Sequence, residues 1–433
     1  MKVSVIANTS NNDISGLPYN DQAITLAGQM AGICYMSDDY TNDKMNNQIN
    51  ARKRAERTSS SGHYSVFEHY HVNLLIEEVP KLVAMFLNNL SVYCTSERSG
   101  RYTIMKPNTA LEQLTYDKWR NYFTNILKGY GVEDAAASKI AQENARYLTS
   151  VFIPTTMAYT IPYNRLLLVL GMIKKLDFGI IKSVNYRNFY KEFTDHLIEF
   201  KNRTMEALKI TDSDLILDDH KNVLQADMLF ENFILNKDNI IIEDENNENF
   251  LYEVSKNLEE EHFGTVYNTT YLASFTALAQ LHRHRRINYT MRMLPYNFNR
   301  LYLEVDDRMY IPDIIRNTPY EIEWKKDYNA LVEAGIIPQA TLVIVHEYGR
   351  FIDFVNSKCK ERLCSRAQYE TAEIVRDTLE KFINADKLNS LSDNRLLNSI
   401  VDENERPIPR CQFEGYTCKE PCALGKYGLI RTW

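Results

Sequence analysis

A cluster of basic residues follows directly on an apolar segment at residues 280–292, and this junction constrains the fold more than any other feature. The stretch QLHRHRRINYTMR contains four arginines and two histidines, although the chain has a net charge of -7. The preceding YLASFTALAQL is apolar and helix-like, as expected of a segment in a core. The charged side chains therefore emerge from packed structure, which predicts a local anion site.

The length and composition limit the class of protein. A chain of 433 residues is long for one ordinary core, so two domains are expected. A hydrophobic fraction of 44% with 25% charged residues is typical of a soluble globular protein, and the negative balance opposes broad nucleic-acid affinity. The N-terminus lacks a secretory signal, and the longest apolar run, LLLVLGMI, is too short to span a membrane. We expect a cytoplasmic protein with neither a membrane nor a nucleic acid as partner.

The seven cysteines fit reduced thiols better than a disulfide framework, because their number is odd and they are scattered. Three of them, Cys411, Cys418 and Cys422, lie close together near the C-terminus, with Cys359 and Cys364 upstream. Soft ligands in this number suit zinc or an iron–sulfur cluster, but their spacing lacks a CxxC element. Unliganded thiols are the favoured interpretation, and a metal site is the alternative.

Apolar segments of helical period alternate with shorter β-branched runs, which predicts a mixed α/β (α+β) fold. Helices are expected at residues 21–35, 76–92, 117–128, 133–150, 187–208, 268–283 and 366–384. Strands are expected at residues 3–7, 69–76, 239–242 and 341–346. Between about residues 210 and 260 the composition becomes acidic and Asn-rich, so a boundary near 215–225 divides the chain into domains 1–215 and 216–433.

The two halves contain a weak internal repeat. In the first half, SGHYSVFEHYHVNLLIEEVPKLVAMFLNNLSVYCTSERSGRYT runs from a His-rich turn through strand and helix into a polar loop. In the second, EHFGTVYNTTYLASFTALAQLHRHRRINYTMR repeats this order with different chemistry at its end. This pattern predicts a tandem duplication.

Several short motifs resemble those of the flavin-dependent thymidylate synthases. That family's signature is Arg-His-Arg, seven variable residues and Ser, commonly continuing as Ser-Gly-Arg-Tyr, and it is preceded by Gly-His-x-Ser-x-x-Glu-His. The chain contains GHYSVFEH at residues 62–69, ERSGRY at 97–102 and QLHRHR at 280–285. Counting back from Ser99 by the family spacing leads to Asn-Leu-Ser, and counting forward from Arg285 leads to Met293. Each half retains the part that the other lacks.

Looser similarities extend over most of both halves. AGQMAGICYMS is similar to the family's early helix, and ENARYLTSVFIP is similar to its Ala-Arg element, with Arg146 in the arginine's place. YNRLLLVL resembles the Asn-x-Arg segment with the pair at Asn164 and Arg165. ERLCSRAQYE resembles Leu-Arg-x-x-Ser-His-Ala-Gln-x-Glu, with Arg362 for the arginine and Arg366 for the histidine.

The residue types suit an anion site without reference to the family. Gln280, Arg283 and His284 lie at i, i+3 and i+4, so on a helix they project from one face. Arginine offers a planar fork of donors to phosphate or carbonyl oxygens, and histidine adds a donor that titrates near neutral pH. In the loop of ERSGRY, Gly100 lets the backbone approach a ligand, and successive N–H groups can hold phosphate oxygens.

The resemblance implies that the chain methylates dUMP at C5, with FAD as cofactor and with NADPH and methylenetetrahydrofolate as co-substrates. It implies that each half is a copy of the family's domain, and that the chain pairs as a homodimer that mimics the family's tetramer. The residues implied for catalysis are Arg283, Ser99 and Arg101. Those implied for the nucleotide are Gln280, Arg283, Glu97, Ser99, Gly100, Arg101, Arg146 and Arg362. Those implied for the flavin are His63, Ser65, Arg283, His284, Arg285, Asn164 and Arg165.

Other interpretations remain open from the sequence. A related flavoenzyme could modify another uracil nucleotide, and a duplicated chain could be a catalytically silent homologue that binds nucleotide or flavin. His63, His69 and His71 alternate as on a strand and could be structural, while Arg146 and Arg362 could be ordinary ion-pair partners. RNA binding by the basic run is opposed by the acidic balance and by the absence of aromatic RNA-binding motifs.

Overall fold

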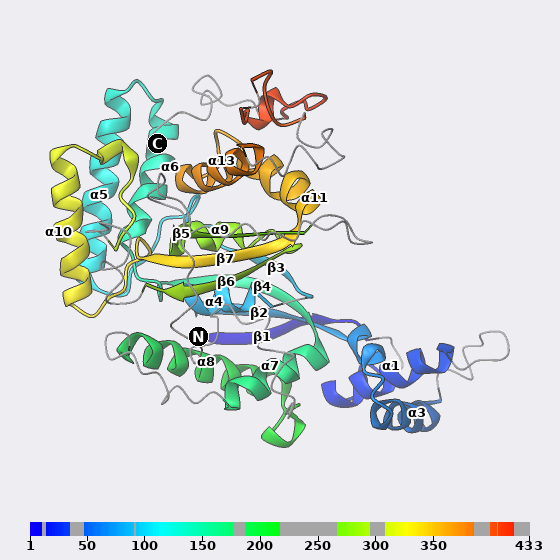
Figure 1. The fold of residues 1–433 in the computed structure, drawn as a ribbon. Helices are drawn as coiled ribbons and strands as arrows, with labels where there is room; N and C mark the ends of the chain where they lie inside the picture. Colours follow the sequence, from blue (N-terminus) through cyan, green and yellow to red (C-terminus); the bar gives the residue numbers. More distant parts are fainter. Residues whose placement is uncertain are drawn as a thin grey trace. The chain divides into compact units, whose positions relative to one another are not determined.

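The chain folds into two compact units whose segments alternate along the sequence. The computed structural model describes residues 1–10, 14–34, 47–90, 92–175, 187–216, 266–294, 308–384, 399–404 and 406–419. The first unit combines Met1–Arg98 with Pro154–Gln225, and the second combines Ser99–Ile153 with Ala226–Trp433. Figure 1 shows the elements coloured along the chain.

The first unit contains a four-stranded antiparallel sheet of order β1-β2-β4-β3. Its strands are β1 (Lys2–Asn8), β2 (His71–Pro80), β3 (Cys94–Glu97) and β4 (Pro154–Pro162). In β2 the side chains of Val72, Leu74 and Ile76 are fully buried, and the residues between them are partly exposed. This alternation of buried and partly exposed side chains is that of a strand with one face in the core.

Helices account for most of the remainder of the first unit. They are α1 (Tyr19–Cys34), α3 (Gln48–Ser60), the short η1 (Ser65–His69), α4 (Lys81–Leu87), α7 (Tyr163–Lys175) and α8 (Arg187–Leu208). Just after α3, Gly62 has φ +76°, and its N–H donates to the carbonyl of Ser59 at 3.0 Å. This left-handed turn explains a glycine at the start of GHYSVFEH, because other residues adopt such a φ only at a cost.

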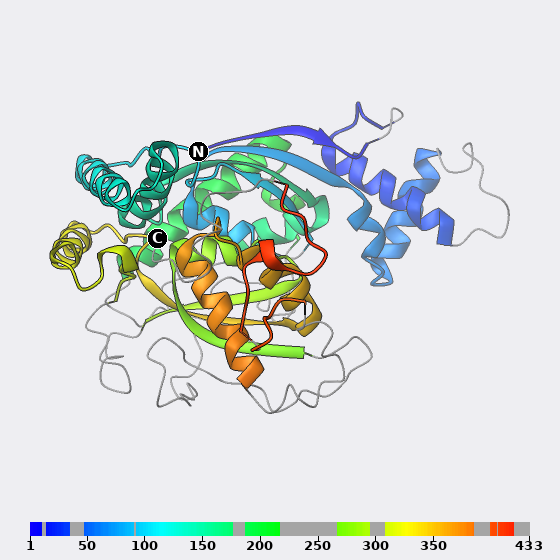
Figure 2. The ribbon, with the colours of Figure 1, turned by 90° about the horizontal axis from the view of Figure 1, so that it is seen from above.

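The second unit contains a three-stranded antiparallel sheet of order β5-β7-β6. Its strands are β5 (Val266–Ser274), β6 (Ile287–Met293) and β7 (Leu342–Arg350). Its longer helices are α5 (Ala110–Gly129), α6 (Asp134–Ala145), α9 (Phe275–Leu281), α10 (Pro319–Glu333) and α13 (Tyr369–Asn384). Short turns complete it: η2 (Arg146–Leu148), η7 (Asp313–Ile315), α11 (Phe351–Asp353), the π-helical η8 (Phe354–Cys359), α12 (Lys360–Arg362) and η9 (Arg410–Gln412). Helix α13 covers one face of the sheet, as both ribbon views show (Figures 1 and 2).

The same strand order recurs in both units. In the first unit β2 leads into the seven-residue α4, and β4 lies between β2 and β3. In the second unit β5 leads into the seven-residue α9, and β7 lies between β5 and β6. This correspondence is what a repeated domain would produce, and the tandem duplication itself stays a prediction.

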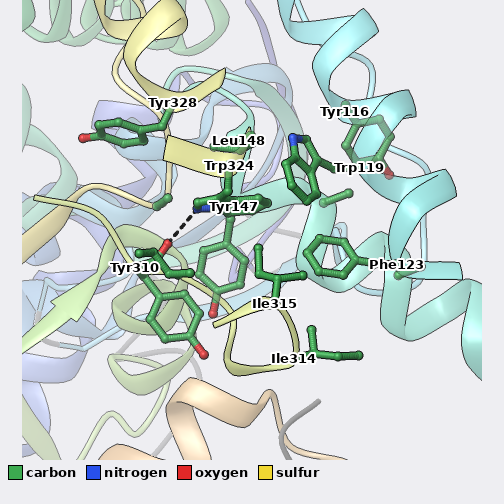
Figure 3. Packing of buried hydrophobic residues seen from close by; sticks show 14 of the residues in the cluster. Tyr116, Trp119, Phe123, Tyr147, Leu148, Tyr310, Ile314, Ile315, Trp324 and Tyr328 are labelled. Atoms are coloured by element: carbon green, nitrogen blue, oxygen red, sulfur yellow. Dashed lines mark hydrogen bonds between the residues drawn. The ribbon is translucent and has the colours of Figure 1, made fainter. Parts of the chain in front are cut away.

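A buried aromatic core joins residues 116–148 to residues 309–340 within the second unit (Figure 3). The rings of Trp119 on α5 and Trp324 on α10 meet edge to face, with centroids 4.8 Å apart. Trp324 Nε1 donates to the carbonyl of Tyr310 at 3.1 Å, which is the hydrogen bond drawn in the figure. Both tryptophans are fully buried, so this core attaches a segment of the first half of the sequence to the second half.

The predicted mixture of helices and strands is confirmed, but two predicted helices begin as strands. Residues 76–80 continue β2, and residues 268–274 belong to β5, so helix starts only at α4 and α9. Both stretches are short and lead directly into a helix, and over so few residues the period of a strand is hard to tell from that of a helix. The predicted strand at residues 239–242 lies outside the described residues.

The compact units do not coincide with the predicted division into residues 1–215 and 216–433. Compactness groups residues 99–153 with the second half, because α5 and α6 pack there. The sequence division was drawn at a change of composition, which does not reveal a segment that crosses over. Whether residues 1–215 and 216–433 are two copies of a duplicated domain remains a prediction.

Among the described helices, none has the length and apolar character needed to cross a bilayer.

Gly28 provides a test of helix packing in the first unit. A Cβ atom at this position of α1 would lie 1.8 Å from the carbonyl oxygen of Ala51 on α3, so the two backbones would have to separate. We predict that Gly28→Ala lowers the free energy of unfolding by roughly 1–3 kcal/mol, because overpacking against a backbone cannot be relieved by a rotamer change. Gly16→Ala, where nothing lies within 4 Å, is the matched control. Equal denaturation midpoints for the two variants would contradict the close approach.

Candidate functional site in the second unit

The Ser-Gly-Arg loop is held in shape by its own backbone and by helix α6. Ser99 accepts backbone hydrogen bonds at its carbonyl from Tyr102 and Thr103, at 3.1 and 3.0 Å. The side chain of Gln142 on α6 donates to the carbonyls of Gly100 at 3.3 Å and of Thr103 at 2.7 Å. The loop is therefore a defined turn.

Two arginines flank this loop in different electrostatic states. Arg101 donates to the carboxylate of Glu143 and to the carbonyl of Arg366. Burial alone would lower the pKa of Arg101, but the Glu143 carboxylate outweighs it and the net shift is upward. Arg146 is buried, and burial lowers its pKa. A Cβ atom on Gly100 would lie 3.6 Å from Arg146 Cδ and 2.9 Å from Met105 Sδ, so glycine allows the loop to lie close to Arg146.

The carboxamide of Gln368 connects Arg146 to Gln280. Gln368 Oε1 accepts hydrogen bonds from Arg146 Nη2 and from Gln280 Nε2. Gln368 Nε2 donates to the hydroxyl of Tyr147, and that hydroxyl donates to Glu370 Oε2 at 2.6 Å. The structure thus brings predicted nucleotide residues from both halves of the sequence onto one amide.

Arg362 and His284 form the other side of the group. Arg362 Nη2 donates to the backbone carbonyl of Gln280, and its Nε donates to His284 Nε2, both at 2.9 Å. Since Nε2 accepts, the imidazole carries its proton on Nδ1, which lies 3.2 Å from Ser357 Oγ. Burial, with the positive charges of Arg362 and Lys358, lowers the pKa of His284 well below its usual range. His284 is neutral at physiological pH.

A buried ion pair supports this side of the site from beneath. Lys358 donates to the carboxylate of Glu347, and both side chains are fully buried. Tyr267 and Tyr271 donate to the same carboxylate at 3.0 and 2.6 Å. Lys358 and Ser357 belong to the π-helical turn η8. This turn therefore positions both the ammonium group of the ion pair and the hydroxyl oxygen that faces His284.

Arg146 and Arg362 differ from a surface arginine in their partners. Within the described part of the chain, neither guanidinium makes an ion pair with a carboxylate, and their hydrogen bonds go to the neutral groups of Gln368, His284 and Gln280. Arginine stays protonated under these conditions, because the ordinary pKa of a guanidinium lies far above neutral pH. Two nearly buried positive charges with neutral partners are suited to an anion, such as phosphate, or to a polarised carbonyl.

The remaining predicted residues of the second unit lie nearby in sequence but are less buried. Arg283 is partly exposed and Arg285 is exposed. Both follow α9 directly, so they lie one turn beyond Gln280 and not on a longer helix as expected. His284 engages both ring nitrogens with protein groups, so a contact between this ring and flavin stays a prediction.

The predicted residues of the first unit fall into separate places. Glu97 receives hydrogen bonds from Lys81 at 2.6 Å and Asn88 at 3.2 Å, so its carboxylate is engaged within the unit. Arg165 pairs with Glu68 at 2.9 Å, and Asn164 caps the backbone of Arg165. His63 and Ser65 are exposed beside η1. Their assignment to flavin stays a prediction.

No group of three His, Cys, Asp or Glu side chains is placed to hold a metal ion within the described residues. None of Cys359, Cys364, Cys411 and Cys418 forms a disulfide within the described residues, and burial raises the pKa of Cys359 well above its ordinary value. Cys422 lies outside the described residues, so the metal alternative for the C-terminal cysteines is still open.

Several residues that shape this site were not predicted from the sequence. Gln368, Tyr147 and Glu370 form its central network, while Glu143 and Ser357 orient Arg101 and His284. Gln368 and Glu370 lie inside ERLCSRAQYE, the stretch that supplied Arg362. The signal available in the sequence was that this amide and this carboxylate closely follow two predicted arginines.

Comparison with protein families matches residues 17–175 to the family described as thymidylate synthase complementing protein. The matched segment contains GHYSVFEH, ERSGRY, Arg146 and the Asn164–Arg165 pair, whereas QLHRHR lies outside it. The resemblance inferred from the motifs is therefore confirmed for this segment. Among curated proteins, no sequence matches the chain.

Solved structures that are similar to the chain have low identity. A flavin-dependent thymidylate synthase from Helicobacter pylori, in complex with FAD and dUMP, is 17% identical with a TM-score of 0.30; the match covers 50% of this chain and 100% of that one. A UMP/dUMP methylase, PolB from Streptomyces cacaoi, bound with 5-Br dUMP, is 14% identical with a TM-score of 0.24; the match covers 39% of this chain and 76% of that one. At such TM-scores these similarities support no conclusion about ligands.

The neutral state of His284 predicts how stability depends on pH. The pKa of this group in the unfolded chain is about 6.5, and in the folded chain it is lower. The contribution of neutral His284 to the free energy of unfolding is therefore complete above about pH 6.5. Below that pH it declines, with a slope of up to about 1.4 kcal/mol per pH unit. Urea unfolding between pH 7.5 and 5 should show a shallower decline in His284→Asn than in the wild type. His196→Asn, on α8, is the control for loss of a histidine outside the site, and identical slopes in wild type and His284→Asn would exclude a buried neutral imidazole.

Proposed function

We propose, from the match of residues 17–175 to the family described as thymidylate synthase complementing protein, that the chain is a flavin-dependent methyltransferase of dUMP. In the proposed reaction the C5 hydrogen of dUMP is replaced by methyl. Methylenetetrahydrofolate supplies the methylene carbon, NADPH supplies the hydride equivalent, a proton leaves C5, and the folate nitrogens take up two protons, so that one proton is consumed overall. The products are dTMP, tetrahydrofolate and NADP⁺.

The observation that carries this proposal is the pair formed by the buried Arg146 and the partly buried Arg362, whose hydrogen-bond partners are neutral groups. Arg146 comes from the family-matched segment, and Arg362 comes from the second half of the sequence. Both connect to Gln280, Arg146 through Gln368 and Arg362 through the backbone carbonyl of Gln280. A nucleoside monophosphate carries the complementary groups, namely a dianionic phosphate and two pyrimidine carbonyl oxygens.

The proposed roles of the side chains follow from their hydrogen-bonding capacity. Arg101 and the backbone N–H groups of the Ser99–Gly100 turn would hold the phosphate, since Arg101 is already oriented by Glu143. Arg146, Arg362 and Gln280 would donate to carbonyl oxygens and polarise the pyrimidine, so that electron density at C5 can reach an electrophile. Preorganised donors avoid the cost of reorienting during the reaction.

FAD, when bound, would supply the redox chemistry and the route for the one-carbon unit. Arg283 and Arg285 would contribute donors for its phosphates, and His63, Ser65, Asn164 and Arg165 are the proposed residues of the first unit. The exposed positions of His63 and Ser65 leave their side chains accessible to a cofactor. An enzyme of this kind would act as a homodimer, which is also a proposal.

The absorption spectrum of the purified protein is the first test. We expect bands near ~370 and ~450 nm from bound oxidised flavin, and bleaching of the ~450 nm band on addition of NADPH. With methylenetetrahydrofolate and dUMP present, dTMP should accumulate. UMP and dCMP serve as controls for nucleotide selectivity. A colourless protein that binds no added FAD would favour the silent homologue, and preferential turnover of UMP would favour an enzyme for another uracil nucleotide.

Subunit mixing tests whether one chain supplies a whole nucleotide site. Arg101 and Arg283 both lie in the second unit of the same chain. We predict that Arg101→Ala and Arg283→Ala each lower kcat/KM by ~100-fold or more, because each removes a charged donor. Co-refolding the two variants should restore no activity, since the nucleotide site of every chain then lacks one of its two arginines. Recovery to about a quarter of the wild-type rate would instead require sites shared between chains, because hybrid dimers would then contain one intact site.

A further inference from the structure

We propose that Gln368 is the positioning residue that sets the geometry of the nucleotide donors, and that a closed ring of hydrogen bonds fixes its amide in one orientation. This inference rests on the proposed function. It concerns residues for which the family resemblance assigned no role.

The direction of every hydrogen bond in the ring follows from donor and acceptor capacity. Glu370 accepts from the N–H of Ser274 at 2.8 Å and from the hydroxyls of Ser274 and Tyr147, both at 2.6 Å. Since the Tyr147 hydroxyl gives its hydrogen to Glu370, it can only accept from Gln368. The NH₂ group of Gln368 therefore faces Tyr147, and its oxygen faces Arg146 and Gln280.

The ring begins and ends on the same helix. Ser274 is the N-cap of α9, where its hydroxyl accepts from the N–H of Ala277 at 3.0 Å. Gln280 lies in the last turn of α9, and it donates to Gln368. A displacement of Gln368 would thus have to break contacts at both ends of a seven-residue helix.

The ring is buried, which makes it selective for one arrangement. Gln368, Glu370 and Ser274 are each at most 3% exposed, and Tyr147 is 1% exposed. Burial raises the pKa of Glu370, and the Ser274 and Tyr147 donors oppose that shift. A flipped amide would turn the NH₂ group of Gln368 toward the donors of Arg146 and Gln280 and its oxygen toward the Tyr147 hydroxyl, so these hydrogen bonds would be lost.

The consequence for ligand binding concerns Arg146. Its Nη2 is held by Gln368, while its Nε is buried and has no hydrogen-bond partner among the described residues. Gln368 therefore fixes the plane of this guanidinium without neutralising its charge. Loss of the amide oxygen would leave Arg146 and Gln280 free to reorient, and the nucleotide would bind to a mixture of geometries.

The test compares three variants by calorimetric titration of the FAD-loaded protein with dUMP. Gln368→Met retains the length of the side chain but removes its polar atoms, and we expect the Kd for dUMP to rise about 10-fold or more. Tyr147→Phe should raise it about fivefold in the wild-type background and by less than about twofold when added to Gln368→Met, since both act through one ring. Gln113→Met, which removes a side-chain hydrogen bond to Asp117 on α5, is the matched control and should leave the Kd unchanged.

Steady-state kinetics separates positioning from loss of structure. Gln368→Met should raise KM for dUMP while leaving KM for NADPH near that of the control. If Gln368→Met fails to fold, Tyr147→Phe serves instead, because it removes only the hydroxyl that accepts from Gln368, and an unchanged Kd for dUMP in this folded variant would overturn the inference. Wild-type affinity in a folded Gln368→Met or additive effects in the double variant would overturn the inference, whereas a wild-type protein that binds no dUMP would refute the proposed function itself.

Discussion

The packing of α5 against α10 is the interaction on which the rest of the second unit depends. Trp119 and Trp324 meet edge to face, and Trp119 Nε1 also donates to Asp327 at 2.7 Å. Lys118 adds an ion pair to the same carboxylate at 2.6 Å. Burial of two indoles contributes several kcal/mol relative to exposure. This contact holds residues 99–153 against a partner about 200 positions away in the sequence.

The site inherits its geometry from that contact. Just beyond α6, the carbonyl of Tyr147 accepts from the N–H of Ala340 at 2.7 Å, and the carbonyl of Thr149 accepts from the N–H of Gln339 at 2.8 Å. These bonds fix the backbone at Tyr147 and Thr149, immediately after Arg146. Because the Tyr147 hydroxyl also accepts from Gln368, the core packing is connected to the placement of Arg146 and Gln280, and a change in the aromatic core should be transmitted to these two side chains.

The sequence motifs indicate the arginines of this site but not the residues that orient them. Arg101, Arg146 and Arg362 stand within recognisable motifs, and their role toward a nucleotide stays a prediction. Gln368 and Glu370 carry no such signal, since their role depends on Tyr147, more than 200 residues earlier in the chain. The same non-local contacts explain the fold: α8 was predicted with its observed limits from its own periodicity, whereas the placement of α5 and α6 in the second unit depends on packing that local patterns do not encode.

The balance of charge around the site explains why arginine, and not lysine, occupies its buried positions. Burial lowers the pKa of Lys358 as it lowers those of Arg146 and Arg362, but Lys358 is accompanied by the Glu347 carboxylate. Without such a partner, a buried lysine can release its proton, because the ordinary pKa of lysine is only about 10.4 and burial lowers it. A guanidinium retains its charge beside Gln368 or His284, both of which are neutral. Neither guanidinium forms an ion pair with a carboxylate among the described residues, and an anionic ligand would supply negative charge at the point where the donors are already oriented.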